Sequence, residues 1–128
     1  MEMEAKRKMV LDVLQLAKAN GCECYMIKPN ANYAYGYIIF PDGTPMYVQK
    51  GWFWGLDFSI SYIPSRETGS GCSCHGEDSI DADDIDWQKI ISLKAKGLAF
   101  ANKLKAKLYP SVDAFIKGRW NWENYERV

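Results

Sequence analysis

Residues 52–63, Trp-Phe-Trp-Gly-Leu-Asp-Phe-Ser-Ile-Ser-Tyr-Ile, carry the clearest structural pattern of the chain. From Trp54 to Tyr62, large apolar side chains alternate with glycine, aspartate and serine. Side chains along a β-strand point alternately to its two faces, so this period of two predicts a strand with one face on a core and the other in water. The segment therefore predicts a sheet that helices cover on one face only.

Three shorter strand signals precede this segment. Pro41-Asp42-Gly43 is a typical hairpin turn, because proline presets φ and glycine accepts positive φ. The strands expected before residue 52 span residues 22–28, 33–40 and 45–50. With residues 52–63 they predict a four-stranded antiparallel sheet, which a long loop over residues 64–79 should follow.

Helices are expected at both ends of the chain. Apolar residues recur at helical spacing over residues 3–19 and again over residues 84–108. The second helix has an apolar arc broader than a one-sided sheet needs, so the first helix, the C-terminal tail or another protomer should cover the excess. A short helix over residues 112–117 should follow, and the aromatic tail, residues 119–125, should dock. The expected fold is α+β, in the order α-β-β-β-β-α-α, with the helices packed on one face.

Composition and charge narrow the class of protein. The chain has 128 residues, enough for one domain, and 48% of them are hydrophobic, which is typical of a globular protein. Its 16 basic and 16 acidic residues cancel, so no overall field favours nucleic acid or membrane. The N-terminal segment is charged, and no apolar run approaches the ~20 residues of a membrane span. We therefore expect a cytoplasmic protein with reduced cysteines and no membrane partner.

Two pairs of cysteines form the first candidate site. Cys22 and Cys24 share one face of an expected strand, whereas Cys72 and Cys74 lie in the long loop beside His75, the single histidine. Four thiolates, or three and the imidazole, would complete a tetrahedral zinc site. The C-x-C spacing departs from the usual zinc knuckle, and the alternative is that Cys22 and Cys24 are small packing residues. A cysteine nucleophile beside His75 lacks an identifiable orienting group.

The long loop contains a second candidate site, for an anion. Arg66 can pair with a phosphate or carboxylate, and the backbone of Gly69-Ser70-Gly71 can donate hydrogen bonds to the same group. Trp52 and Trp54 can stack on a base. The combination predicts a site for a phosphorylated small molecule or a nucleotide. It matches no established phosphate-binding motif, and a flexible connector is the alternative.

Two further surfaces are candidates for contact with a macromolecule. Tyr33, Tyr35 and Tyr37 share one face of the second expected strand, and an amphipathic aromatic face is typical of recognition sites. Lysines, including Lys96 and Lys103, line the long helix opposite its apolar arc with almost no acidic partner. The alternatives are tyrosines that cover the sheet and lysines on a solvated helix face. The acidic residues at 77–86 fit helix capping better than a calcium loop.

The functional hypothesis follows from what these sites lack. No nucleophile, base and orienting group can be named together, which favours a non-enzymatic role. The leading hypothesis is a small binding or inhibitor protein for a protein or nucleic-acid partner, in the style of phage and mobile-element accessory proteins such as anti-defence proteins. A homodimer is one way to cover the excess apolar arc. The alternatives are a zinc-stabilised domain and a binder or enzyme for a nucleotide at Arg66.

Overall fold

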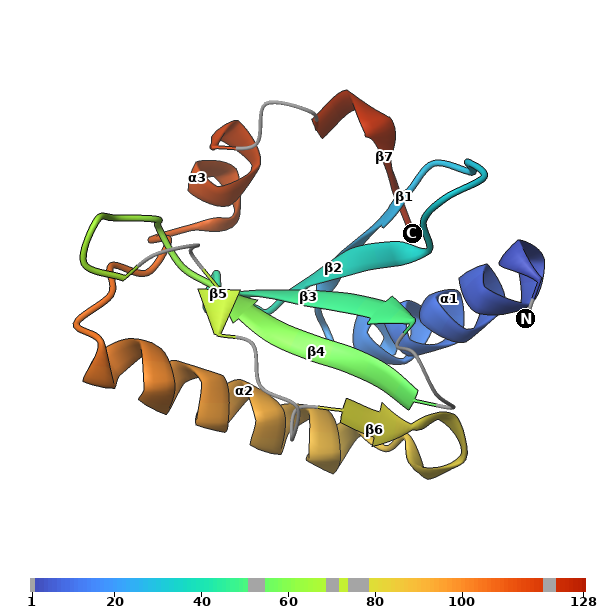
Figure 1. Cartoon of the computed structure of the whole chain (residues 1–128), viewed down its shortest axis with the longest axis horizontal. Helices are drawn as coiled ribbons and strands as arrows, with labels where there is room; N and C mark the ends of the chain where they lie inside the picture. Colours follow the sequence, from blue (N-terminus) through green and yellow to red (C-terminus); the bar gives the residue numbers. More distant parts are fainter. Residues whose placement is uncertain (1, 51–54, 69–71, 74–78, 119–121) are drawn as a thin grey trace.

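The computed structural model describes residues 2–50, 55–68, 72–73, 79–118 and 122–128. These residues form an α+β fold in which helices flank an antiparallel sheet, as the sequence predicted (Figure 1). Both α1 and α3 have the predicted limits. No helix in these ranges is both long and apolar enough to cross a membrane. The helical elements are α1 (Met3–Ala19), η2 (Ala82–Asp84), α2 (Trp87–Lys103), α3 (Val112–Lys117) and η3 (Trp122–Asn124), where η denotes a 3₁₀ turn.

Within the described residues, the sheet is wider than the four strands expected. Six strands lie in the order β5-β4-β3-β2-β1-β7, and a seventh, β6, also pairs with β4. Because β3 occupies one edge of β4, β5 and β6 share its other edge. The three unexpected strands, β5, β6 and β7, have two or three residues each, too few to show a period of two. The strands are β1 (Glu23–Ile27), β2 (Tyr35–Ile39), β3 (Pro45–Lys50), β4 (Gly55–Ser61), β5 (Cys72–Ser73), β6 (Ser79–Asp81) and β7 (Tyr125–Arg127).

The helices α1 and α2 pack on one face of the sheet, called here the first face (Figure 1). α1 contacts β1, β2 and β3, and α2 contacts β4 and β5. Strands β1 to β4 direct even-numbered residues to this face, and Ile38, Met46 and Ile60 are among those that are at most 1% exposed. The result is an aliphatic core, to which α1 contributes Val10, Val13, Leu14 and Ala17.

The opposite, second face is covered by α3 and η3, so the expectation that the helices share one face is wrong (Figure 1). Phe115 of α3 is fully buried there, with its ring centroid 5.0 Å from that of Tyr37. Ser59 and Ser61, polar positions of the alternating pattern in β4, are only 7% and 8% exposed and do not face water. The alternation predicted which residues share a face. It did not show that tyrosine rings give the second face enough apolar area to bury a helix.

A glycine sets how closely α1 approaches the sheet. Gly36 of β2 faces α1, and a Cβ at this position would lie 2.8 Å from Cδ1 of Leu14 and would also collide with the carbonyl oxygen of Tyr25. Real side chains do not approach so closely, so any larger residue would push the helix or the neighbouring strand away. The close packing of α1 therefore depends on the missing side chain.

The helix α2 ends at Lys103, short of its predicted limit, because the chain turns at Lys105 with a φ of 57°. The amide of Lys105 donates to the carbonyl of Asn102 at 3.0 Å, and that of Ala106 donates to Ala101 at 2.9 Å. These two bonds form a Schellman motif, in which the residue with positive φ is usually glycine. Because a lysine occupies this position, the sequence did not indicate the end of the helix. Leu108, expected in the buried stripe, lies beyond the helix and is 45% exposed.

Candidate functional site

The three tyrosines that were predicted to form an open face differ in exposure. Tyr37 is 4% exposed and Tyr35 is half-buried, whereas Tyr33 is 58% exposed. The ring of Tyr33 lies edge-on to that of Tyr35, with centroids 6.0 Å apart. Of the three, only Tyr33 presents most of its surface to a partner, so the predicted recognition face is reduced to its rim.

Most of the second face is occupied by an aromatic cluster that has a structural role. Trp122 stacks on Tyr125 with centroids 4.8 Å apart, and it meets Tyr25 edge-on at the same separation. These rings bury one another's surface and hold α3 and the C-terminal segment on the sheet. Burial, and then the hydrogen bond and charge of Glu23, raise the pKa of Tyr25, which remains a neutral phenol. The aromatic cluster comprises Tyr25, Tyr35, Tyr37, Tyr47, Tyr109, Phe115, Trp122 and Tyr125.

Of the cysteines predicted to bind zinc, the structure describes Cys22, Cys24 and Cys72, and it places the first two far from the third. Cys22 and Cys24 are 6% and 1% exposed within the aliphatic core of the first face. Strand β1, which contains Cys24, lies four strand positions from β5, which contains Cys72. At a strand spacing of about 4.8 Å, this separation is roughly 19 Å, too far for one zinc ion to bind both Cys24 and Cys72. Among the described residues, no group of three or more His, Cys, Asp or Glu side chains could hold a metal ion.

The two thiols on the first face are also poor ligands or nucleophiles in their present state. Burial raises the pKa of Cys22 to about 11. Burial, and then the neighbouring thiol of Cys22, raise the pKa of Cys24 to about 12. Metal binding and nucleophilic attack require the thiolate, which is scarce at neutral pH for such groups. The alternative interpretation from the sequence, that both are packing residues, fits their burial.

The anion site predicted around Arg66 is described only in part. Arg66 is exposed in a turn a few residues after the end of β4. The hydroxyl of Ser65 accepts a hydrogen bond from the amide of Thr68 at 3.1 Å, which closes this turn. Trp52, Trp54 and Ser70 lie outside the described residues, as do Cys74 and His75. The nucleotide hypothesis therefore stays a prediction.

The lysines of α2 fall into two groups. Lys96 and Lys103 are exposed along the outer side of the helix, as predicted. Lys89 and Lys94 make defined contacts instead. The ammonium of Lys89 donates to the backbone carbonyl of Asp84 at 2.9 Å, and that of Lys94 lies 2.7 Å from the carboxylate of Asp42. The lysines that line α2 are consequently a less uniform surface than the sequence indicated.

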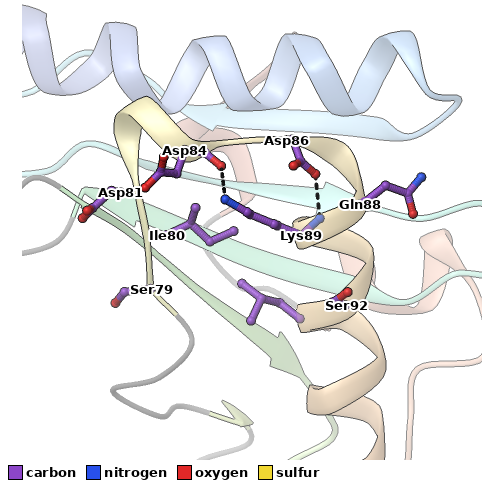
Figure 2. Close-up of a pocket in the computed structure, with 9 residues that line it drawn as sticks. Ser79, Ile80, Asp81, Asp84, Asp86, Gln88, Lys89 and Ser92 are labelled. Carbon is purple, nitrogen blue, oxygen red and sulfur yellow. Dashed lines mark hydrogen bonds between the residues drawn. The ribbon is translucent and has the colours of Figure 1, made fainter.

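A groove that the sequence did not predict lies between β6, η2 and the first two turns of α2 (Figure 2). It encloses about 570 Å³ and is called here the α2 groove. Ile80, which is 8% exposed, and Leu93, which packs on the aliphatic core, provide its apolar surface. Carboxylates line its acidic rim. The full lining comprises Ser79, Ile80, Asp81, Asp84, Asp86, Gln88, Lys89, Ser92 and Leu93.

The charged groups of the α2 groove are unequally committed to internal contacts. Asp86 accepts a hydrogen bond from the backbone amide of Lys89 at 2.9 Å, so it caps α2 as the acidic run predicted (Figure 2). The side chain of Lys89 crosses the groove toward η2. Asp81 and Asp84 are exposed at the rim of the groove. The rim is therefore net negative, with three carboxylates and one ammonium.

The signal for this groove was present in the sequence but had a second explanation. The acidic residues at 77–86 were interpreted as complements to the helix dipole, which accounts for Asp86. Asp81 instead belongs to β6, a strand of three residues that pairs with one edge of β4. Locating the groove requires the pairing of β6 with β4, a contact between distant segments that no local pattern encodes.

A second cavity, of about 520 Å³, lies between β1, the 41–43 turn and the start of α3. Three of its polar side chains, those of Glu23, Tyr25 and Arg127, are engaged with one another. Arg127 lies 3.7 Å from the carboxylate of Glu23, and the hydroxyl of Tyr25 donates to Glu23 at 3.0 Å. Because these polar groups are already engaged, this cavity offers a ligand less than the α2 groove does.

In comparisons with known proteins, no family model, no curated protein and no solved structure matches the chain.

Proposed function

We propose that this chain is a non-enzymatic binding protein that holds a segment of a protein partner in the α2 groove. The observation that carries this proposal is the position of an acidic rim directly beside an apolar surface, in a groove of about 570 Å³. Clefts of this size that combine apolar walls with a few polar groups are typical of binding sites.

The chemistry of the groove favours a basic side chain with a long aliphatic stem. Lysine and arginine bury their methylene groups on apolar surface and keep their charged heads at a polar edge. Ile80 and Leu93 offer that surface, and Asp81 and Asp84 offer the edge. Carboxylate–guanidinium pairs are charge-assisted and directional, so arginine would gain most.

Charge also favours protein over nucleic acid as the partner at this site. Phosphates approaching the rim would meet Asp81 and Asp84 within a Debye length of about 8 Å, where repulsion is not screened. The ammonium of Lys89 donates a hydrogen bond to the backbone carbonyl of Asp84, so it is not positioned to attract an incoming phosphate. An inhibitory role, of the kind that phages and mobile elements employ, is a narrower form of this proposal and depends on the identity of the partner.

Selection from a random peptide display library tests the proposal. We expect the selected peptides to carry lysine or arginine beside an aliphatic residue. Neutralising the rim with Asp81→Asn and Asp84→Asn should weaken their binding at least about tenfold, the loss of roughly one charge-assisted pair. Affinity measured by calorimetry should also fall as salt is added.

A matched control separates the groove from general charge. Asp12→Asn with Glu67→Gln removes two exposed carboxylates elsewhere on the molecule and should leave peptide affinity unchanged. Peptides that bind equally well to the wild type and to the neutralised groove, or a selection dominated by acidic peptides, would show that the α2 groove is not the site.

A further inference from the structure

The helix α2 has an outward side that no described element covers, and this side borders the α2 groove, whose lining residues Asp84 and Asp86 lie at the start of the helix. Ile91 is 36% exposed, one of few large apolar residues so exposed in the described part of the chain. Ala95 and Ala99 follow it at one-turn spacing, and both are exposed. With the half-buried Leu98 and the exposed Asn102, these residues form what is called here the outer flank. It contains no charged residue, although lysines border it.

Charge is distributed unequally along the same helix. Asp83 and Asp84 of η2 lie just before α2, and Asp86 caps its first turn. Lys103 is its last residue, and further lysines follow. The helix therefore presents an acidic end and a basic end, separated by the outer flank. At a rise of 1.5 Å per residue, the 17 residues of α2 span about 25 Å.

From this arrangement we infer that the outer flank binds the outer flank of a second copy of this chain, with the two α2 helices antiparallel. A two-fold axis across the helix reverses its direction, so the acidic end of each copy meets the basic end of the other. A parallel arrangement would place like charges together at both ends, which is unfavourable. Charge thus selects both the occupant of the flank and its orientation.

The register follows from the midpoint of the helix. Ala95 is the central residue of α2, Trp87–Lys103, so it lies on the two-fold axis and Ile91 packs against Ala99 of the other copy. Small residues on the axis allow the two backbones to approach to about 8 Å, the short end of helix–helix distances. A contact along one helix is small for a specific interface, so we expect a reversible dimer with a dissociation constant on the order of 10 µM.

The first test measures molar mass by sedimentation or light scattering as concentration rises. The wild type should pass from monomer to dimer around the expected dissociation constant. Ala95→Glu places two like charges on the axis and should leave the chain monomeric at about 100 µM, ten times that constant. The matched control is Ala5→Glu, at an exposed alanine of α1, which should dimerise as the wild type does.

The second test exchanges charges and does not depend on the fold tolerating Ala95→Glu. Asp83→Lys and Lys103→Glu should each weaken the dimer about tenfold or more, because both ends then carry like charges. An equimolar mixture of the two variants restores an attractive pair at each end and should form a mixed dimer with near wild-type affinity. Neither variant alters Asp81 of the α2 groove. If the chain dimerises as expected but binds no peptide, the proposed peptide site is wrong and the inferred dimer stands.

Three results would overturn the inferred dimer. The first is a wild type that remains monomeric at about 1 mM, a hundred times the expected constant. The second is a dimer that Ala95→Glu leaves intact, since contact must then lie elsewhere. The third is a mixture of Asp83→Lys and Lys103→Glu that associates no better than either variant alone.

Discussion

The two faces of the sheet are buried by different means. On the first face, aliphatic side chains of the strands interlock with α1 and α2, and Val10, Leu14 and Ile38 are fully buried. On the second face, aromatic rings from the strands meet those of α3 and η3, and the hydroxyls of Tyr25 and Tyr47 donate hydrogen bonds to Glu23 and Gln49. Aliphatic packing depends on filling volume, whereas ring packing also depends on orientation.

The difference explains where a partner can still bind. Each face has its own covering layer, so neither is left as the broad open surface that one-sided packing would provide. Among the described residues, the accessible features considered above lie at the borders of the layers: Tyr33 at the rim of the second face, and the α2 groove and outer flank beside the first. Under the proposed function, a partner would therefore bind beside the sheet and not on either of its faces.

The largest effect is expected where the second face is most tightly closed. Phe115→Ala should lower the free energy of unfolding by about 4 kcal/mol, because a fully buried ring is lost from between Tyr37, Tyr109 and Trp122. Urea denaturation measures this loss. Ile116→Ala, at the neighbouring half-buried position, should cost only about 1 kcal/mol. A loss below about 1.5 kcal/mol for Phe115→Ala would mean that the aromatic cluster contributes little to stability.

The thiols on the first face should react slowly with alkylating reagents. With its pKa at about 11 instead of the ordinary 9.0, Cys22 should react with iodoacetamide about a hundredfold more slowly in the folded protein than in guanidinium, at about pH 8. Mass spectrometry of the peptide that contains Cys22 and Cys24 provides the rates. Equal rates in both conditions would contradict the burial of these thiols.

The same shifts predict a dependence of stability on pH. The folded state holds the two thiol protons more tightly than the unfolded state does. Their contribution to stability is therefore complete below about pH 9 and is lost as the pH rises through about 11 and 12. Cys22→Ala with Cys24→Ala should make stability less dependent on pH in this alkaline range.

A smaller effect tests how closely the first face is packed. Gly36→Ala should lower the free energy of unfolding by about 2 kcal/mol, because the added methyl group meets Leu14 and the backbone of Tyr25. The control is Gly118→Ala, where the nearest atom is 3.4 Å from the added Cβ and the change should be within about 0.5 kcal/mol. If Gly36→Ala proves neutral, α1 can move away from the sheet at little cost.

The smallest effect concerns the link between α2 and the hairpin turn. The ammonium of Lys94 lies 2.7 Å from the Asp42 carboxylate and 4.7 Å from the centroid of the Phe40 ring. Lys94→Met should cost about 1 kcal/mol, because the lysine side chain is only 19% exposed. Lys8→Met, which breaks an ion pair that is 77% and 58% exposed, should cost at most about 0.5 kcal/mol. Equal losses in thermal melts of the two variants would show that partial burial adds nothing.

The Lys94 contact also predicts a dependence on acid. Burial acts to raise the pKa of Asp42, but hydrogen bonds from Lys94 and Thr44 outweigh it and hold the pKa below its ordinary 3.8. The contribution to stability is thus present above about pH 3.8 and is lost as the pH falls through the lower, folded-state value. Lys94→Met should therefore be least harmful in strong acid.

The elements with strong local signals were predicted from the sequence, and those defined by distant contacts were not. Helical spacing and caps located α1 and α3, and the period of two sorted the residues of β4 between the faces. By contrast, β5, β6 and β7 exist because they pair with strands already formed, and their own residues show no pattern.

The candidate sites were also difficult to predict, because a site forms only where residues from distant parts of the chain come together. The sequence shows two C-x-C motifs, but it does not show how far apart they lie in the fold. The strands that contain Cys24 and Cys72 are four positions apart in the sheet. Tyr35 and Tyr37 share one face of β2, as the sequence predicted, but rings that help to bury Tyr37 come from Phe115 and Trp122, which lie far along the chain. The α2 groove likewise forms only when β6 joins β4.

The pairing of β1 with β7 has a consequence for the synthesis of the chain. Tyr25 in β1 lies opposite Arg127 in β7 in the register of the two strands, roughly 100 residues later in the chain. At about 5–20 residues per second, a ribosome needs several seconds to add that length. During this interval one edge of β1 has no strand to bind, and an unpaired strand edge readily joins other chains. A nascent chain of this protein should therefore be most vulnerable to aggregation shortly before β7 emerges.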